Sequence, residues 1–218
     1  MSVKEIVLGV TGSIGAYKAA DLVRRLKEQG CGVTCVMTKE AREFIAPLTL
    51  QALSERKVWT DLFELEDPHV IHTTLADRAN LVLIAPATAN VIAKLAYGFA
   101  DDLLTCVALA TKAPVLIAPA MNVHMYTHPT VQENIKRLRR LGHHFIGPDV
   151  GALACGYEAI GHVADVEQIV HAALHLASPS STPAARTEKA SARPQPAPHR
   201  KPRRPPTRTR PKPARRRR

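Results

Sequence analysis

The chain has few cysteines, and the four that it has, Cys31, Cys35, Cys106 and Cys155, are scattered. No Cys-x-x-Cys pair or Cys/His set has the spacing of a zinc site, so no metal site is expected. The amino terminus lacks the apolar segment of a secretory signal, which predicts a cytoplasmic protein without structural disulfides. Cys31 and Cys35 stand in an apolar run and are predicted to be buried thiols.

Long apolar runs are also missing. No stretch of roughly 18 apolar residues is free of charge, which argues against a membrane-spanning helix.

Acidic residues are almost absent from the last forty positions. Residues 179–218 contain eleven arginines, three lysines, ten of the seventeen prolines and one acid, Glu188, which gives a net charge of +13. Residues 1–178 carry a net charge of −2. A segment of this composition buries too little apolar surface to offset its ordering entropy. We therefore predict a folded domain at residues 1–177 and a disordered Pro/Arg-rich tail at residues 178–218.

The tail has no aromatic side chain on which a nucleic-acid base could stack. Weak association with acidic partners is the expected behaviour of such a segment. The alternative is a protein whose basic tail binds nucleic acid through salt-sensitive contacts, with the folded domain as a platform.

Four unbroken apolar runs predict strands that are buried on both faces: Ile6–Val10, Val33–Met37, Leu81–Ala85 and Val115–Ala118. Helical patterns lie between them, at Gly15–Gln29 and Val131–Leu141, and each stops at a glycine, Gly30 or Gly142. Strands that alternate with helices predict an α/β fold with a doubly wound parallel sheet.

Ligands of such sheets sit at the carboxyl ends of the strands. The first loop there contains Gly12, Ser13, Ile14 and Gly15 and leads into a helix, which favours an anionic group such as a phosphate. The second strand ends at Thr38 rather than at an acidic residue that could bind an adenosine ribose, so a mononucleotide fits better than NAD. A plain tight turn is the alternative for this loop.

Two further loops carry unusual residues. Pro86-Ala-Thr88-Ala-Asn90 follows the third strand, and Pro119-Ala-Met-Asn122-Val-His-Met125-Tyr follows the fourth. Their hydroxyl and amide groups suit ligand binding, while helix capping is the alternative for Thr88 and for Asn122.

These loops resemble the Pro-Ala-Ser-Ala-Asn-Thr and Pro-x-Met-Asn-x-x-Met-Trp motifs of the homo-oligomeric flavin-containing cysteine decarboxylases, which include the phosphopantothenoylcysteine decarboxylases. The segments 11–18, 44–53, 100–103 and 153–157 are also similar to the decarboxylase half of the bifunctional bacterial coenzyme A enzymes. The resemblance covers roughly residues 3–177. It implies a Rossmann-like flavoprotein that binds FMN. Related flavin prenyltransferases lack the Met-Asn motif.

The resemblance also implies an activity. FMN takes electrons from the thiol of 4'-phosphopantothenoylcysteine, CO2 leaves the resulting thioaldehyde as an enethiolate forms, and re-reduction gives 4'-phosphopantetheine. A decarboxylase of peptidyl C-terminal cysteine is the alternative within the same family.

Site residues follow from the same resemblance. The catalytic residues would be His72 as the base, Asn122 to orient the carboxylate, and Cys155 to protonate the enethiolate from a flap flanked by Gly151 and Gly161. Substrate contacts would come from Asn122, Met125 and Ala154. The residues expected to bind FMN are Gly12, Ser13, Ile14, Thr38, Thr88, Ala89, Asn90 and Ala120.

The chain departs from the family pattern around both His72 and His162. Thr73, Thr74 and Asn80 replace the usual residues near His72, whose alternative is a solvated loop histidine, and an ordinary buried thiol is the alternative for Cys155. His162 and Val163 replace the usual Arg-Met that closes the flap. The family further implies a homotrimer or a dodecamer, and a separate ligase that would supply the substrate, because the tail cannot hold a ligase domain.

Overall fold

The computed structural model describes residues 3–63, 70–152, 156 and 158–178. The chain divides into two units, residues 1–184 and 185–218, and every described residue belongs to the first. From residue 179 onward the predicted tail therefore lies outside the described residues.

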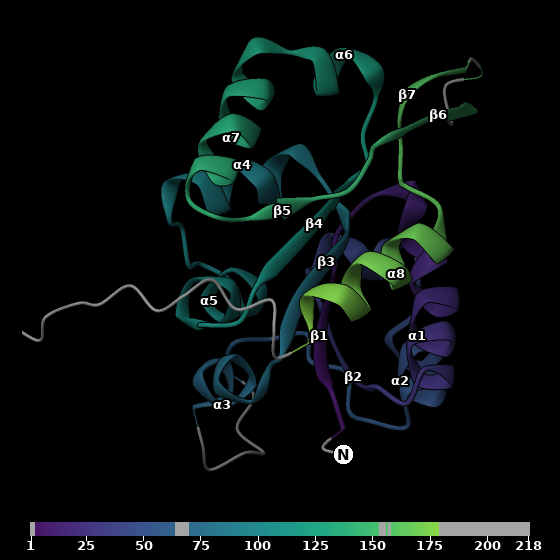
Figure 1. Ribbon diagram of the computed structural model, residues 1–218, viewed down its shortest axis with the longest axis vertical. Helices are drawn as coiled ribbons and strands as arrows, with labels where there is room; N and C mark the ends of the chain where they lie inside the picture. Colours follow the sequence, from purple (N-terminus) through teal and green to yellow (C-terminus); the bar gives the residue numbers. More distant parts are fainter. Residues whose placement is uncertain (1–2, 64–69, 153–155, 157, 179–218) are drawn as a thin grey trace, which may run out of the picture. The chain divides into compact units, whose positions relative to one another are not determined.

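Five parallel strands form the central sheet, in the order β2-β1-β3-β4-β5 (Figure 1). They are β1 Glu5–Val10, β2 Gly32–Met37, β3 Leu81–Ala87, β4 Val115–Pro119 and β5 His144–Phe145. The four predicted apolar runs lie inside β1 to β4, so the prediction of a doubly wound parallel sheet is confirmed. The two-residue strand β5 is not predicted by the sequence, because it has no apolar run.

The strand order reverses between β1 and β3. The chain runs from β1 outward to β2 and then returns past β1 to form β3 on the other side. In sheets of this order, ligands bind in the crevice outside the carboxyl ends of the two strands at the reversal.

Helices cover both faces of the sheet (Figure 1). α1, α2 and α8 pack on one face, and α3, α4, α5 and α7 pack on the other. The α-helices are α1 Lys18–Glu28, α2 Pro47–Ser54, α3 Ile71–Arg78, α4 Ala89–Tyr97, α5 Leu103–Ala110, α6 Val123–Thr127, α7 Pro129–Arg140 and α8 Val166–Leu176, with 3-10 turns η1 Ile14–Tyr17 and η2 Glu40–Glu43.

Glycines end two of the helices as predicted. Gly30 after α1 has a φ of 75° and Gly142 after α7 has a φ of 92°, values that are unfavourable for a residue with a side chain. The predicted start of the first helix at Gly15 is wrong: the 3-10 turn η1 comes first, and α1 begins at Lys18. The backbone N–H of Ala16 bonds to Ser13 O at 2.8 Å, which tightens this turn.

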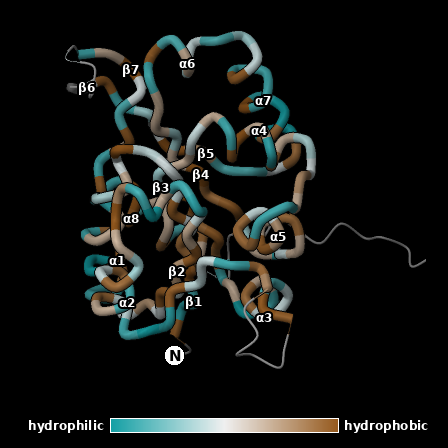
Figure 2. The backbone as a smooth tube through the Cα atoms, turned by 180° about the vertical axis from the view of Figure 1, so that it is seen from behind, coloured by the Kyte–Doolittle hydropathy of each residue, from teal (hydrophilic) through white to brown (hydrophobic). Residues whose placement is uncertain are grey.

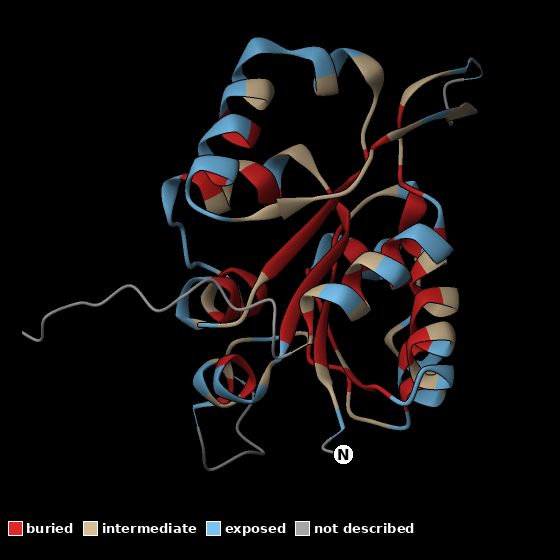
Figure 3. Cartoon of the chain, viewed as in Figure 1, coloured by how far each residue is buried: buried red, intermediate tan, exposed pale blue. Residues whose placement is uncertain are grey.

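The core has two layers because successive strand residues face opposite sides of the sheet. On β1, Leu8 packs under α1 and α8, whereas Val7 packs under the helices of the other face. Figure 3 shows β1 to β4 largely buried, and Figure 2 shows strongly hydrophobic backbone in these strands. Cys31 and Cys35 are buried as predicted, and burial raises the pKa of Cys35 to about 12.

A separate antiparallel hairpin stands at the position of the predicted flap (Figure 1). It consists of β6 Asp149–Ala152 and β7 Glu158–His162. Its tip, residues 153–155 and 157, lies outside the described residues. Among the described helices, none combines the length and the apolar character that a membrane crossing requires.

Candidate functional site

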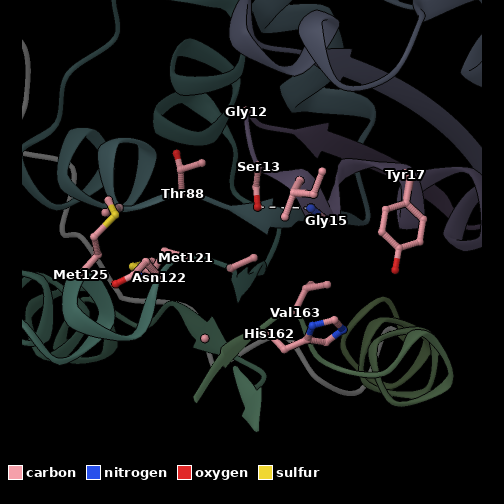
Figure 4. A pocket seen from close by; sticks show the side chains of 14 residues that line it. Gly12, Ser13, Gly15, Tyr17, Thr88, Met121, Asn122, Met125, His162 and Val163 are labelled. Carbon is pink, nitrogen blue, oxygen red and sulfur yellow. Dashed lines mark hydrogen bonds between the residues drawn. The ribbon is translucent and has the colours of Figure 1, made fainter. Parts of the chain in front are cut away.

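A cavity of about 520 Å³ opens at the carboxyl ends of β1, β3 and β4, where the strand order reverses (Figure 4). We call it the switch-point pocket. Four segments line it: residues 12–15 with Tyr17, residues 88–89, residues 120–122 with Met125, and residues 161–163.

The first wall is the loop between β1 and η1. The Oγ of Ser13 accepts a hydrogen bond from the backbone N–H of Gly15 at 3.4 Å (dashed in Figure 4). A Cβ on Gly12 would lie 2.4 Å from the Cβ of Glu40, so only glycine lets this loop pass so close to η2. The loop turns tightly into a helical segment, a geometry that directs backbone N–H groups toward an anion.

A buried threonine joins this wall to the second. The Oγ1 of Thr11 donates to the carbonyl of Pro86 at 2.7 Å and accepts from the backbone N–H of Thr88 at 3.1 Å. The loops after β1 and β3 are therefore fixed to each other at the reversal point. Thr88 also caps α4, since its Oγ1 accepts from the N–H of Val91 at 3.4 Å.

The third wall is the loop after β4. The N–H of Ala120 donates to Ala87 O at 3.0 Å, which holds this loop against the end of β3. Asn122 is the N-cap of α6, because its Oδ1 accepts from the N–H of His124 at 2.8 Å. Asn122 lines the pocket while it caps, so capping does not exclude its predicted binding role, which stays a prediction.

The fourth wall is the end of β7, which touches two other walls. The N–H of Met121 donates to Gly161 O at 3.0 Å. On the opposite side, Lys18 Nζ lies 2.9 Å from Nε2 of His162 and 3.4 Å from the carbonyl oxygen of Val163. The residues 161–163 thus connect the loop after β4 to the first residue of α1.

The pocket lining is mainly apolar. Among its residues only Tyr17 and His162 carry a titratable group, and no carboxylate faces it. Within the described part of the chain, no group of His, Cys, Asp and Glu side chains could hold a metal ion. The ammonium of Lys18 lies 2.9 Å from the lining side chain of His162, which brings a positive charge next to the first wall.

Flavin mononucleotide fits this arrangement. The volume lies within the roughly 300–1,000 Å³ of small-molecule sites. The glycine-containing loop suits a phosphate, and the apolar lining of Ala89, Ala120 and Met121 suits a flat aromatic ring system. A Cβ added to Gly15 would lie 3.2 Å from a methyl of Val163. The first wall, residues 12–15, which we call the phosphate loop, is therefore in contact with the fourth wall.

Seven residues predicted from sequence lie together in the pocket. They are Gly12, Ser13, Ile14, Thr88, Ala89, Ala120 and Asn122, and the predicted substrate contact Met125 joins them.

Three predicted residues do not line this pocket within one chain. His72 is half-buried on α3, Thr38 is buried with its Oγ1 accepting from the N–H of Ala41 at 3.4 Å, and Asn90 is exposed on α4. Their predicted roles remain predictions. Ala154 and Cys155 lie outside the described residues.

Several lining residues are not predicted as site residues by the sequence. Gly161, His162 and Val163 come from a hairpin whose approach to the pocket depends on its pairing with β6, and no local pattern indicates this. The glycine is a usable signal. Gly161 has a φ of 136°, and a Cβ there would lie 2.1 Å from Met121 O.

Comparisons with known proteins agree with this geometry. Residues 1–178 match the model of the family described as Flavoprotein. The coenzyme A biosynthesis bifunctional protein CoaBC of Bacillus subtilis is 50% identical over 182 residues, which cover 83% of this chain and 45% of that protein. The chain thus spans less than half the length of this relative.

A probable phosphopantothenoylcysteine decarboxylase of Streptococcus mutans is 48% identical over 77% of this chain and 95% of its own length. Among solved structures, the FMN-dependent cysteine decarboxylase SpaF superimposes with a TM-score of 0.72 and 32% identity over 81% of this chain and 97% of its own. The chain belongs to the flavoprotein family, as its loops indicate.

Proposed function

We propose that this protein binds FMN and decarboxylates 4'-phosphopantothenoylcysteine to 4'-phosphopantetheine, a step of coenzyme A synthesis. The observation that carries the proposal is the meeting of the glycine-containing loop and the Met-Asn loop in one pocket at the switch point of the sheet. The relative that this chain covers almost completely, at 48% identity, is named for the same activity.

The FMN phosphate would be held by the backbone of Gly12, Ser13 and Ile14. Thr88, Ala89 and Ala120 would contact the rest of the cofactor. Thr38 and Asn90 do not line the pocket of one chain, so they would act on the cofactor through other residues. When bound, FMN supplies a two-electron acceptor and donor for the substrate thiol, so the reaction needs no other oxidant.

Asn122 is proposed to orient the substrate carboxylate. Its side chain lies at the pocket, on a loop fixed by Ala120 to β3 and by Met121 to β7. The carboxylate of the thioaldehyde would leave as CO2 while the electrons of the breaking carbon–carbon bond move through the C=S bond onto sulfur, which gives the enethiolate. Met125 would pack against the substrate, and the predicted roles of Ala154 and Cys155, which lie outside the described residues, remain part of this proposal.

His72 is the proposed base, although it does not line the pocket of its own chain. Its role therefore requires that a second copy supply it, which supports the predicted homotrimer or dodecamer. A fully active enzyme with the mass of one chain in solution would contradict this arrangement. A separate ligase is proposed to make the substrate, and the cytoplasmic location predicted from the sequence is retained in this proposal.

The test begins with the purified protein. We expect flavin absorption, release of bound FMN on denaturation, and formation of CO2 and 4'-phosphopantetheine in equal amounts from 4'-phosphopantothenoylcysteine. Asn122→Ala should keep FMN and lower kcat by about 100-fold or more, as losses of an orienting group do. His124→Ala, on the same helix but outside the pocket, should retain both properties.

Two outcomes separate the alternatives. A yellow protein that converts only a peptide ending in cysteine would establish the peptidyl-cysteine decarboxylase instead. A colourless protein that cannot be reconstituted with FMN would contradict the whole proposal.

A further inference from the structure

The contact between Lys18 and His162 joins two walls of the switch-point pocket that are 144 positions apart in sequence. Lys18 is the first residue of α1, directly after the phosphate loop and its 3-10 turn. His162 is the last residue of β7 and lines the pocket itself. The contact is 2.9 Å long and partly buried.

The chemistry of the two groups decides the direction of this hydrogen bond. A lysine ammonium only donates, so Nε2 of His162 is the acceptor in this contact. The same ammonium also donates to Val163 O at 3.4 Å. Lys18 therefore contacts β7 at a side chain and at the backbone of the next residue.

The surrounding residues leave room for this contact. A Cβ on Gly151, across the hairpin, would lie 3.4 Å from the Cβ and ring of His162, which is ordinary van der Waals contact, so β6 packs closely beside the imidazole. Gly15 gives Val163 similar space on the α1 side. The N–H of Met121 also donates to Gly161 O. The end of β7 is therefore held by Lys18 and by the loop after β4.

We propose that His162 is a positioning residue of the cofactor pocket: its Nε2 accepts a hydrogen bond from Lys18 and thereby holds the β7 wall against the phosphate loop. The inference rests on the proposed binding of FMN in this pocket. It assigns His162 no proton transfer and no direct contact with the reacting atoms. Its effect is on how tightly the assembled pocket binds FMN.

The experiment measures FMN affinity by quenching of flavin fluorescence on titration of the apoprotein. His162→Leu and Lys18→Met should each weaken FMN binding by about tenfold, the expected effect of losing a hydrogen bond to a charged group. The double variant should bind no more weakly than Lys18→Met, because Lys18→Met already removes the contact with His162. His162→Gln retains an acceptor oxygen and should restore affinity to within about threefold of the original protein.

A matched control is available on the same helix. Lys27 of α1 also donates to a backbone carbonyl, Leu53 O, at 3.0 Å and forms an ion pair with Glu55, but it does not line or touch the pocket. Lys27→Met should therefore leave FMN affinity unchanged. Thermal unfolding of each apoprotein distinguishes a lost fold from a lost contact.

Turnover separates a positioning role from a catalytic one. At saturating FMN, kcat of His162→Leu should stay within about threefold of the original, whereas a proton-transferring histidine would lower it by about 100-fold or more. The inference is overturned if His162→Leu binds FMN normally, or if the effects of the two single variants multiply in the double variant. If the unmodified protein binds FMN but does not decarboxylate the substrate, the proposed substrate fails while the affinity test remains valid.

Discussion

Gly161 shows how a single residue shapes the pocket. Its φ of 136° lies in a region that residues with side chains rarely adopt, and an added Cβ would lie 2.1 Å from the carbonyl oxygen of Met121. Gly98, after α4, also has a positive φ, of 72°, but nothing lies within 4 Å of an added Cβ. A side chain at Gly98 would therefore cause backbone strain alone, whereas a side chain at Gly161 would cause backbone strain and a steric clash.

Alanine substitutions should reveal this difference. We expect Gly98→Ala to lower the free energy of unfolding by about 1 kcal/mol, the cost of a left-handed residue with a side chain. Gly161→Ala should cost more than about 3 kcal/mol or shift β7 away from the loop after β4, and in either case weaken FMN binding. Urea unfolding and FMN titration of both variants test this, and equal losses in the two variants would contradict the role of the close contact.

Several predicted site residues both cap a helix and line the pocket. Ser13, Thr88 and Asn122 each accept a hydrogen bond from a backbone N–H at the start of a helix, and each lines the pocket. In the sequence, capping and binding are competing interpretations of such residues. They coexist because the start of a helix at the end of a strand is where a doubly wound sheet places its ligand.

The turn after α7 carries a titratable group whose environment changes on folding. His143 is half-buried, and its backbone N–H donates to Leu138 O at 3.0 Å. Burial lowers the pKa of His143 below its ordinary value of 6.5, and the charge of His144 lowers it further. The unfolded chain thus takes up this proton at a higher pH than the folded chain does.

The sign of the effect on stability follows from linkage. Above the unfolded pKa His143 is neutral in both states, and the folded protein loses stability as the pH falls from about 7 toward the lowered folded pKa. His143→Gln should reduce the loss of unfolding free energy between about pH 7 and about pH 5. His144→Gln should reduce it less, because burial is the larger cause. Identical pH profiles for the original protein and His143→Gln would contradict this account.

At the scale of elements, prediction succeeds where the signal is local. β1 to β4 carry unbroken apolar runs, and α1 and α7 carry an apolar stripe and a terminal glycine. β5, β6 and β7 are not predicted as strands, because their pairing depends on partners outside their own sequence. β6, for example, gains its partner only when the chain folds back after the tip to place His162 opposite Asp149.

At the scale of the whole molecule, charge separates the chain into two parts. The folded part has a net charge of −2, and residues 179–218 have a net charge of +13. The described part ends with a fixed residue. Ser178 Oγ accepts from Lys4 Nζ at 3.0 Å and donates to Leu174 O at 2.9 Å, so Ser178, one residue beyond the predicted boundary of the domain, is bonded to the folded part.

A chain that ends at Ser178 tests this division. FMN affinity and turnover should stay within about twofold of the full chain, because truncation beyond the packed residues removes no core contact. Retention on heparin should be lost, since the positive charge lies in the tail. Loss of FMN binding in the shortened chain would place part of the tail in the functional unit, and retained heparin binding would place the basic surface in the folded domain.

The sequence by itself determined the fold class and the three loops that meet in the pocket, because each depends on local composition or on periodicity along a short segment. The boundary between folded domain and tail stays a prediction. Only the tertiary structure decided that β7 is a wall of the pocket, that Lys18 reaches His162, and that His72 stands apart within one chain. These facts depend on contacts between segments 40 to 144 positions apart, and such contacts follow from how the helices and strands pack in three dimensions rather than from any pattern within one segment.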